Sequence, residues 1–120
     1  MAKNYRNIKA WQLADKLVKE IYTDIRGFPD TELYGTTSQL RRAAVSVPCN
    51  VVEGSSRKNN KDYLRFLYIA KGSLSETEYL LSLSESLGFL KKDHYSHLDK
   101  LCQESAKTLY GLIQSVSQNI

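Results

Sequence analysis

Apolar residues recur at steps of three and four along almost the whole 120-residue chain. Residues at this spacing lie on one face of an α-helix, so the pattern predicts amphipathic helices that bury that face. Only two prolines and six glycines interrupt the chain, which allows the helices to be long. The sequence contains no alternating strand pattern, internal repeat or low-complexity linker. It therefore predicts one all-α domain that covers residues 1–120.

The periodic segments predict four helices, at residues 8–26, 31–56, 61–87 and 93–118. Short connections between four helices imply an antiparallel, up-down-up-down four-helix bundle. The predicted inward stripe of the first helix consists of Trp11, Ala14, Val18, Ile21, Tyr22 and Ile25. A chain of this length buries a single modest core, which small domains often reinforce by oligomerisation.

The second helix contains a proline within its apolar pattern. Pro48 has no N–H group to donate to the carbonyl of Ala44, so we expect a kink near Pro48. The sequence Thr36 to Gln39 has the spacing of a capping box, which would place the start of regular helix there.

A polar stripe formed by Ser46, Asn50 and Glu53 follows one face of the same helix. One interpretation is structural, because such residues often satisfy capping or buried backbone groups near a kink. Alternatively, Glu53 pairs with Arg42 or Arg57, on the same face or across a subunit boundary. The other interpretation is that the stripe binds a partner.

The third helix carries two apolar stripes. One contains Tyr63, Leu67, Ala70, Leu74, Thr77 and Leu81, and the other contains Phe66, Ile69, Ser73, Leu80, Leu83 and Leu87. One neighbouring helix cannot cover both stripes. The pattern therefore favours a central place in the bundle, a contact between subunits, or both.

Positive charge concentrates in the middle of the chain. The net charge is +4, and residues 41–71 contain seven Lys or Arg against two Asp or Glu. The basic set consists of Arg41, Arg42, Arg57, Lys58, Lys61 and Arg65. These residues either bind phosphate groups or form a solvated charged surface, and the sequence leaves both interpretations open. It contains no base-reading motif, so nucleic-acid binding would depend on shape and backbone.

Catalytic patterns are scarce, and the sequence predicts no enzyme, cofactor or metal site. His94 and His97 stand three residues apart near a helix start, which leaves histidine phosphotransfer as a weaker alternative. Cys49 and Cys102 are expected to be small core-filling thiols of a reduced cytoplasmic protein. The segment that begins at Met1 lacks the apolar stretch of a signal peptide, and no apolar run approaches a membrane span. We therefore expect a soluble cytoplasmic protein with no membrane partner.

Residues 39–54 read QLRRAAVSVPCNVVEG, with Trp11 before them and Phe28-Pro29 and Tyr34-Gly35 in the expected order. This arrangement resembles the bacterial four-helix-bundle family named for ribosomal RNA intervening sequences. The resemblance implies a ring-shaped homopentamer. It extends to the accessory protein of diversity-generating retroelements, where it implies a basic ring that works with a reverse transcriptase and nucleic acid. Some family members are encoded in ribosomal RNA inserts, which suggests contact with RNA.

Together these observations predict a non-enzymatic scaffold that self-assembles and presents a basic surface. The expected partners are other copies of the chain, and RNA, DNA or a protein that handles nucleic acid. The alternative is a protein-interaction or structural oligomer with no nucleic-acid role.

Overall fold

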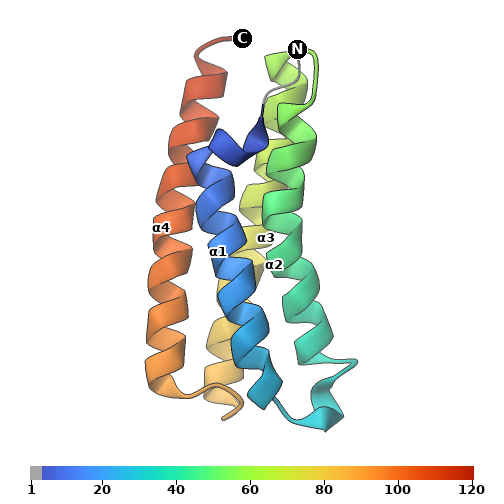
Figure 1. The fold of residues 1–120 in the computed structure, drawn as a ribbon, viewed down its shortest axis with the longest axis vertical. Coiled ribbons are helices and arrows are strands. Elements are labelled where there is room, and N and C mark those ends of the chain that lie inside the picture. The colour runs from blue at the N-terminus through green and yellow to red at the C-terminus, as the bar shows by residue number, and fades with distance from the viewer. Residues whose placement is uncertain (1–3) are drawn as a thin grey trace.

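All four periodic segments form α-helices in the computed structural model, which describes residues 4–120 (Figure 1). The helices are α1 (Lys9–Asp24), α2 (Thr36–Ser55), α3 (Asn60–Ser86) and α4 (Lys92–Ser117). Each packs against the next along the chain, and α1 also packs against α4. The bundle measures 45 × 24 × 20 Å. The predicted all-α, up-down-up-down bundle is confirmed, while residues 1–3 of the predicted domain and N-terminal segment lie outside the described residues.

The observed helix ends differ from the predicted ones most clearly before α2. Its predicted start at residue 31 is wrong, because Asp30–Glu32 forms a separate 3₁₀ turn and regular helix begins at Thr36. The capping box is also wrong: Gly35 is the N-cap, and the Thr36 N–H donates to Glu32 Oε1 at 3.3 Å. The first helix ends at Asp24, two residues early, because Ile25–Gly27 tightens into a 3₁₀ turn.

The other two helices follow the prediction to within one residue at each end. Asn59 caps α3, because its Oδ1 accepts a hydrogen bond from the Asp62 N–H at 2.8 Å. After α3, Gly88 has a φ of +81°, a conformation that glycine adopts easily and that ends the helix. The Asn60 side chain donates to the Asn119 carbonyl at 3.1 Å and so ties the end of the chain to the start of α3. No helix among the described residues is both long and apolar enough to cross a membrane.

Helix α2 continues through Pro48, whose side chain is buried. The kink remains a prediction. The helix ends at Ser55, within one residue of its predicted end, and the turn follows. A Cβ atom on Gly54 would lie 2.9 Å from Phe66 Cβ and 2.9 Å from Tyr63 Cδ1. Gly54 therefore permits α2 and α3 to approach closely.

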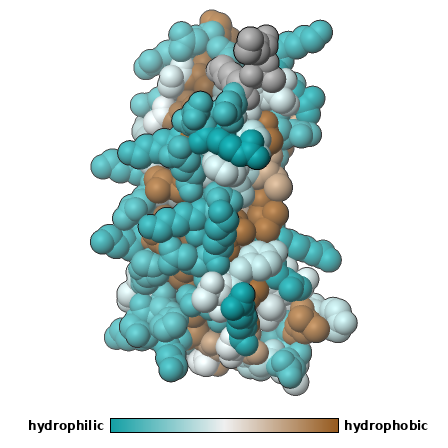
Figure 2. Space-filling view, in the orientation of Figure 1, coloured by the Kyte–Doolittle hydropathy of each residue, from teal (hydrophilic) through white to brown (hydrophobic). Residues whose placement is uncertain are grey.

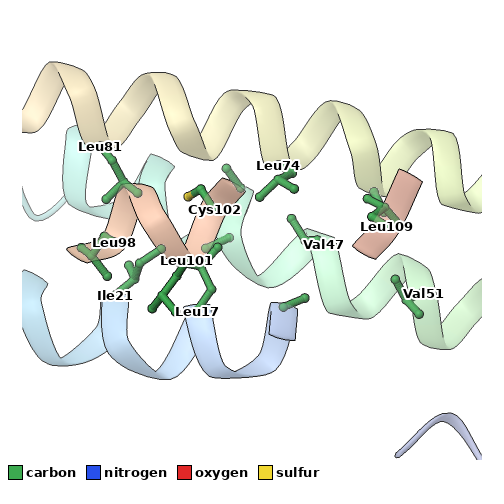
Figure 3. Packing of buried hydrophobic residues seen from close by; sticks show 14 of the residues in the cluster. Leu17, Ile21, Val47, Val51, Leu74, Leu81, Leu98, Leu101, Cys102 and Leu109 are labelled. Carbon is green, nitrogen blue, oxygen red and sulfur yellow. The ribbon is translucent and has the colours of Figure 1, made fainter. Parts of the chain in front are cut away.

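The core runs along the bundle axis and takes side chains from all four helices (Figure 3). The first predicted stripe of α3 is entirely buried: Tyr63, Leu67, Ala70, Leu74, Thr77 and Leu81. Thr77 is accommodated because its Oγ1 donates to the Ser73 carbonyl at 2.8 Å. The second stripe is only partly covered, and its members Ile69 and Leu87 are exposed.

The apolar stripe of α1 was predicted partly wrongly. Leu17 is fully buried beside Ile21 (Figure 3), whereas Tyr22 is 42% exposed and Trp11 and Val18 are half-buried. Steps of three and four include both the centre and the edge of a helical stripe, so spacing alone did not distinguish them. The misplaced residues lie on the side of α1 that faces α2.

The two cysteines have different environments. Cys102 is buried in the core as expected, but Cys49 is exposed, so the prediction of a core-filling thiol is wrong for Cys49. Burial, and to a lesser extent the negative charges of Glu78 and Asp99, raise the pKa of Cys102 to about 12. The native protein therefore keeps this thiol protonated above pH 9, the ordinary pKa of a free thiol.

This pKa predicts a loss of stability at alkaline pH. Between pH 9 and 12 the unfolded thiol releases a proton that the native thiol retains, so the free energy of unfolding falls as pH rises. From pH 8 to pH 10, wild type should lose about 1.4 kcal/mol more than Cys102→Ala. Urea unfolding of both proteins at each pH measures this difference. The cavity left by Cys102→Ala lowers stability equally at both pH values, so it does not affect the change between pH 8 and pH 10. An equal loss of stability in the two proteins over this range would contradict the prediction.

Candidate nucleic-acid interface

The six predicted basic residues form two groups. Arg57, Lys58, Lys61 and Arg65 surround the turn between α2 and α3. Arg41 and Arg42 lie in the first half of α2, and the 15 residues from Arg42 to Arg57 span about 22 Å along the helix axis. The structure therefore does not bring the six residues into one patch.

Two arginines of the turn group are engaged by neighbouring side chains. Arg57 Nη2 lies 3.1 Å from Glu53 Oε1, and Arg65 Nη2 lies 3.0 Å from Asp62 Oδ1. Both guanidinium groups also lie 4.5 Å from the ring centroid of Phe66. A phosphate group would compete with these contacts. Each exposed ion pair is weak, but together with the ring contacts they hold the two arginines in place.

The polar stripe on α2 forms local hydrogen bonds. Asn50 Nδ2 donates to the Ser46 carbonyl at 2.8 Å and to Ser46 Oγ at 3.0 Å. Ser73 Oγ donates to Ser46 Oγ at 2.8 Å, which links α3 to α2. Glu53 pairs with Arg57, as one of the two expected partners, and Arg42 has no such contact. The stripe thus satisfies its own polar groups near Pro48 and links α2 to α3 through one hydrogen bond.

Arg41 and Arg42 border a hollow of about 490 Å³ on the α1–α2 face. We call it the arginine hollow; it is lined by Tyr22, Ser38, Arg41, Arg42, Val45 and Ser46. Its lining contains no carboxylate, and neither arginine forms an ion pair or hydrogen bond with any described residue. Two adjacent, unpaired guanidinium groups make this hollow electropositive. Sequence reasoning did not place Tyr22 here.

A second concave surface adjoins the arginine hollow at Val45. This α1–α2 groove has a volume of about 430 Å³ and is lined by Tyr5, Trp11, Asp15, Val18, Val45, Pro48, Cys49, Val52 and Glu53. Figure 2 shows hydrophobic residues, in brown, at the surface among hydrophilic ones. Tyr5 packs edge-on against Trp11 with 4.9 Å between ring centroids. Trp11 and Val18 pack against the core on one side, and the groove leaves the rest of their surface partly exposed.

The two histidines line a different hollow, of about 290 Å³, between α1 and α4. His94 Nδ1 lies 3.1 Å from Asp24 Oδ1, and His97 Nε2 lies 2.5 Å from Glu20 Oε1. Asp93 adds a third carboxylate, so the hollow is unfavourable for nucleic acid. Within residues 4–120, no three His, Cys, Asp or Glu side chains are placed to hold a metal ion. The histidines thus cross-link α1 to α4.

Comparisons with known proteins agree with the fold and identify the family. Residues 6–111 match the family described as 23S rRNA-intervening sequence protein. A crystal structure of a protein of unknown function from the S23 ribosomal protein family of Bacteroides thetaiotaomicron is similar, with a TM-score of 0.80 and 20% identity over 87% of this chain and 97% of that one. At this identity the likeness shows the fold alone. No curated protein matches the chain. Because the family match spans most of the chain, the protein belongs to the 23S rRNA-intervening sequence protein family.

Proposed function

We propose that this protein is a non-enzymatic, self-assembling scaffold that binds nucleic acid through a basic surface centred on Arg41 and Arg42. The observation that carries the proposal is the pair of guanidinium groups without carboxylate partners in the arginine hollow. Arginine matches phosphate geometry with paired N–H donors. Since these two arginines have no ion pair to break, a phosphate can bind at little cost.

Binding of this kind is directed by the phosphate backbone. Lys58 and Lys61 are exposed at the other end of the bundle, have no ion pair with a described residue, and form a second, separate positive surface. Phosphate contacts release counterions and make affinity fall steeply with salt. The description of the family names 23S rRNA, which makes RNA the first ligand to test.

Charge reversal at the hollow tests the proposal. We expect Arg41→Glu/Arg42→Glu to lower RNA affinity at least ~10-fold and to reduce the slope of log affinity against log salt by about 2, because two phosphate contacts are lost. The matched control is Lys100→Glu/Lys107→Glu, two exposed positions on α4 with the same change in net charge. Fluorescence anisotropy with labelled RNA over a series of salt concentrations measures the affinity and its salt dependence. Equal losses in the two variants would reject Arg41 and Arg42 as the binding site.

Self-assembly is supported by two different apolar surfaces. One is the α1–α2 groove, and the other is the exposed part of α3 around Tyr68 and Ile69. A contact that joins two different surfaces is heterologous, and it closes into a ring when its rotation permits. A ring would repeat Arg41 and Arg42 around its axis and so multiply the potential. The subunit number of five follows from the family resemblance described above.

Substitution of Ile69 tests this assembly. Ile69 is exposed in the monomer, so Ile69→Asp should leave the bundle folded but place a carboxylate in the subunit contact, where burial of its charge is costly. We expect a fall from oligomer to monomer mass in light scattering coupled to size-exclusion chromatography. Tyr110→Asp on α4, also exposed, is the control and should keep the wild-type mass. Exposed Cys49 should also be alkylated faster in Ile69→Asp if the groove is the partner surface.

A further inference from the structure

We propose that the arginine hollow accommodates one unpaired nucleotide, with its base stacked on Tyr22 and its phosphate held by Arg41 and Arg42. The inference rests on the proposed function and narrows it. It makes single-stranded or looped nucleic acid, rather than duplex, the preferred ligand. The hollow is within the roughly 300–1,000 Å³ of small-molecule sites, at about 490 Å³.

Tyr22 is the first part of the argument. It belongs to the apolar spacing of α1, yet its side chain is 42% exposed at the rim of the hollow. Its ring makes no ring contact, and its hydroxyl makes no hydrogen bond, with any described residue. Packing within the described chain thus covers only part of the Tyr22 side chain. An exposed aromatic face beside a cationic surface is the arrangement on which unpaired bases stack.

The polar lining is the second part. Ser46 Oγ accepts hydrogen bonds from Asn50 and Ser73, and no described residue accepts the proton of its own hydroxyl. The Ser38 side chain also has no hydrogen-bond partner among the described residues. Two guanidinium groups and two hydroxyls can thus donate, and no carboxylate competes as an acceptor. This donor-rich lining fits a ligand rich in acceptor oxygens, as a nucleotide phosphate is.

These contacts predict a preference for single-stranded over double-stranded nucleic acid. In a duplex the bases are stacked and paired, so Tyr22 cannot reach a base face while the arginines still reach phosphates. A single strand offers both contacts at once. Loss of the Tyr22 ring should therefore weaken single-strand binding and leave duplex binding unchanged, whereas loss of the two arginines should weaken both.

The experiment compares a labelled unstructured 12-nucleotide RNA with a 12-base-pair RNA duplex, in fluorescence anisotropy at one fixed salt concentration. We expect Tyr22→Ala to lower single-strand affinity about 5- to 150-fold, the range that base–aromatic stacking gives. Tyr22→Phe keeps the ring and should retain the affinity. Tyr79→Ala removes another exposed tyrosine, on α3, and should change neither affinity.

The outcomes separate the two proposals. If Tyr22→Ala binds both RNAs as wild type does while Arg41→Glu/Arg42→Glu loses both, the nucleotide site is rejected and the basic surface stands. If wild type binds neither RNA at low salt, both proposals are overturned.

A second measurement needs no variant: a single strand that carries 5-iodouridine should photo-crosslink to the peptide containing Tyr22. Crosslinking confined to other peptides would reject the site.

Discussion

Leu74→Asp is expected to unfold the bundle. Leu74 is 2% exposed and lies in the central core on α3 (Figure 3). The substitution removes the packing of a buried leucine, which costs about 2–5 kcal/mol, and adds a desolvated carboxylate, which costs several more. Domains of this size are stable by only about 5–15 kcal/mol in total. Circular dichroism at 222 nm should show most of the helical signal lost at 25 °C.

Leu87→Asp makes the same chemical change at an exposed position and serves as the control. Leu87 is 54% exposed just after α3, so its substitution should alter the free energy of unfolding by about 0.5 kcal/mol or less. The two variants together separate the effect of burial from that of the added charge. If Leu74→Asp retained wild-type helicity and assembly, the assignment of Leu74 to the core would be wrong.

Gly54→Ala is the second change with a large expected effect. Alanine is the better helix former by about 1 kcal/mol, so an open site would be stabilised. At Gly54, however, the new Cβ would lie 2.9 Å from Phe66 Cβ and 3.2 Å from the Tyr63 carbonyl oxygen. Both atoms belong to or adjoin the backbone of α3, so α2 and α3 must separate. We expect a net loss of about 1–3 kcal/mol in urea unfolding.

The chain offers two matched controls for this substitution. Gly72 in α3 and Gly111 in α4 are also inside helices, and a Cβ at either position would meet no atom within 4 Å apart from the adjacent backbone of its own helix. Gly72→Ala and Gly111→Ala should therefore stabilise the protein by about 0.5–1 kcal/mol each. Opposite signs for the same substitution would show that close packing, not propensity, decides the result at Gly54. A stabilised Gly54→Ala would show that the helices can separate freely.

Helical periodicity was sufficient to predict the bundle, because each long segment buries one face. It located the buried stripe of α3 around Leu74 correctly, since that stripe has neighbours on both sides. On α1 the same spacing included Tyr22 and omitted Leu17, because the choice between them depends on where α2 and α4 lie. The cap of α2 was missed for a similar reason. Glu32 reaches the Thr36 N–H only after Asp30–Glu32 has turned.

The candidate site was partly predictable from local spacing. Glu53 precedes Arg57 by four residues and Asp62 precedes Arg65 by three. Helix geometry therefore predicts that these carboxylates pair with the two arginines. The residues three and four away from Arg41 and Arg42 include no carboxylate, which also agrees with their unpaired state.

Tyr22 could not be found in this way. It joins the arginine hollow from α1, across the interface between two helices, and only their packing brings it there.

The hydrogen bond from Asn60 to the Asn119 carbonyl determines how the protein can be tethered. It holds the end of α4 beside the start of α3, and the turn at Tyr5–Asn7 lies at the same end of the bundle (Figure 1). Arg41 and Arg42 lie near the start of α2, in the opposite half. A biosensor surface or fusion partner attached at the end of α4 would thus extend from this pole and leave the arginine hollow open to RNA.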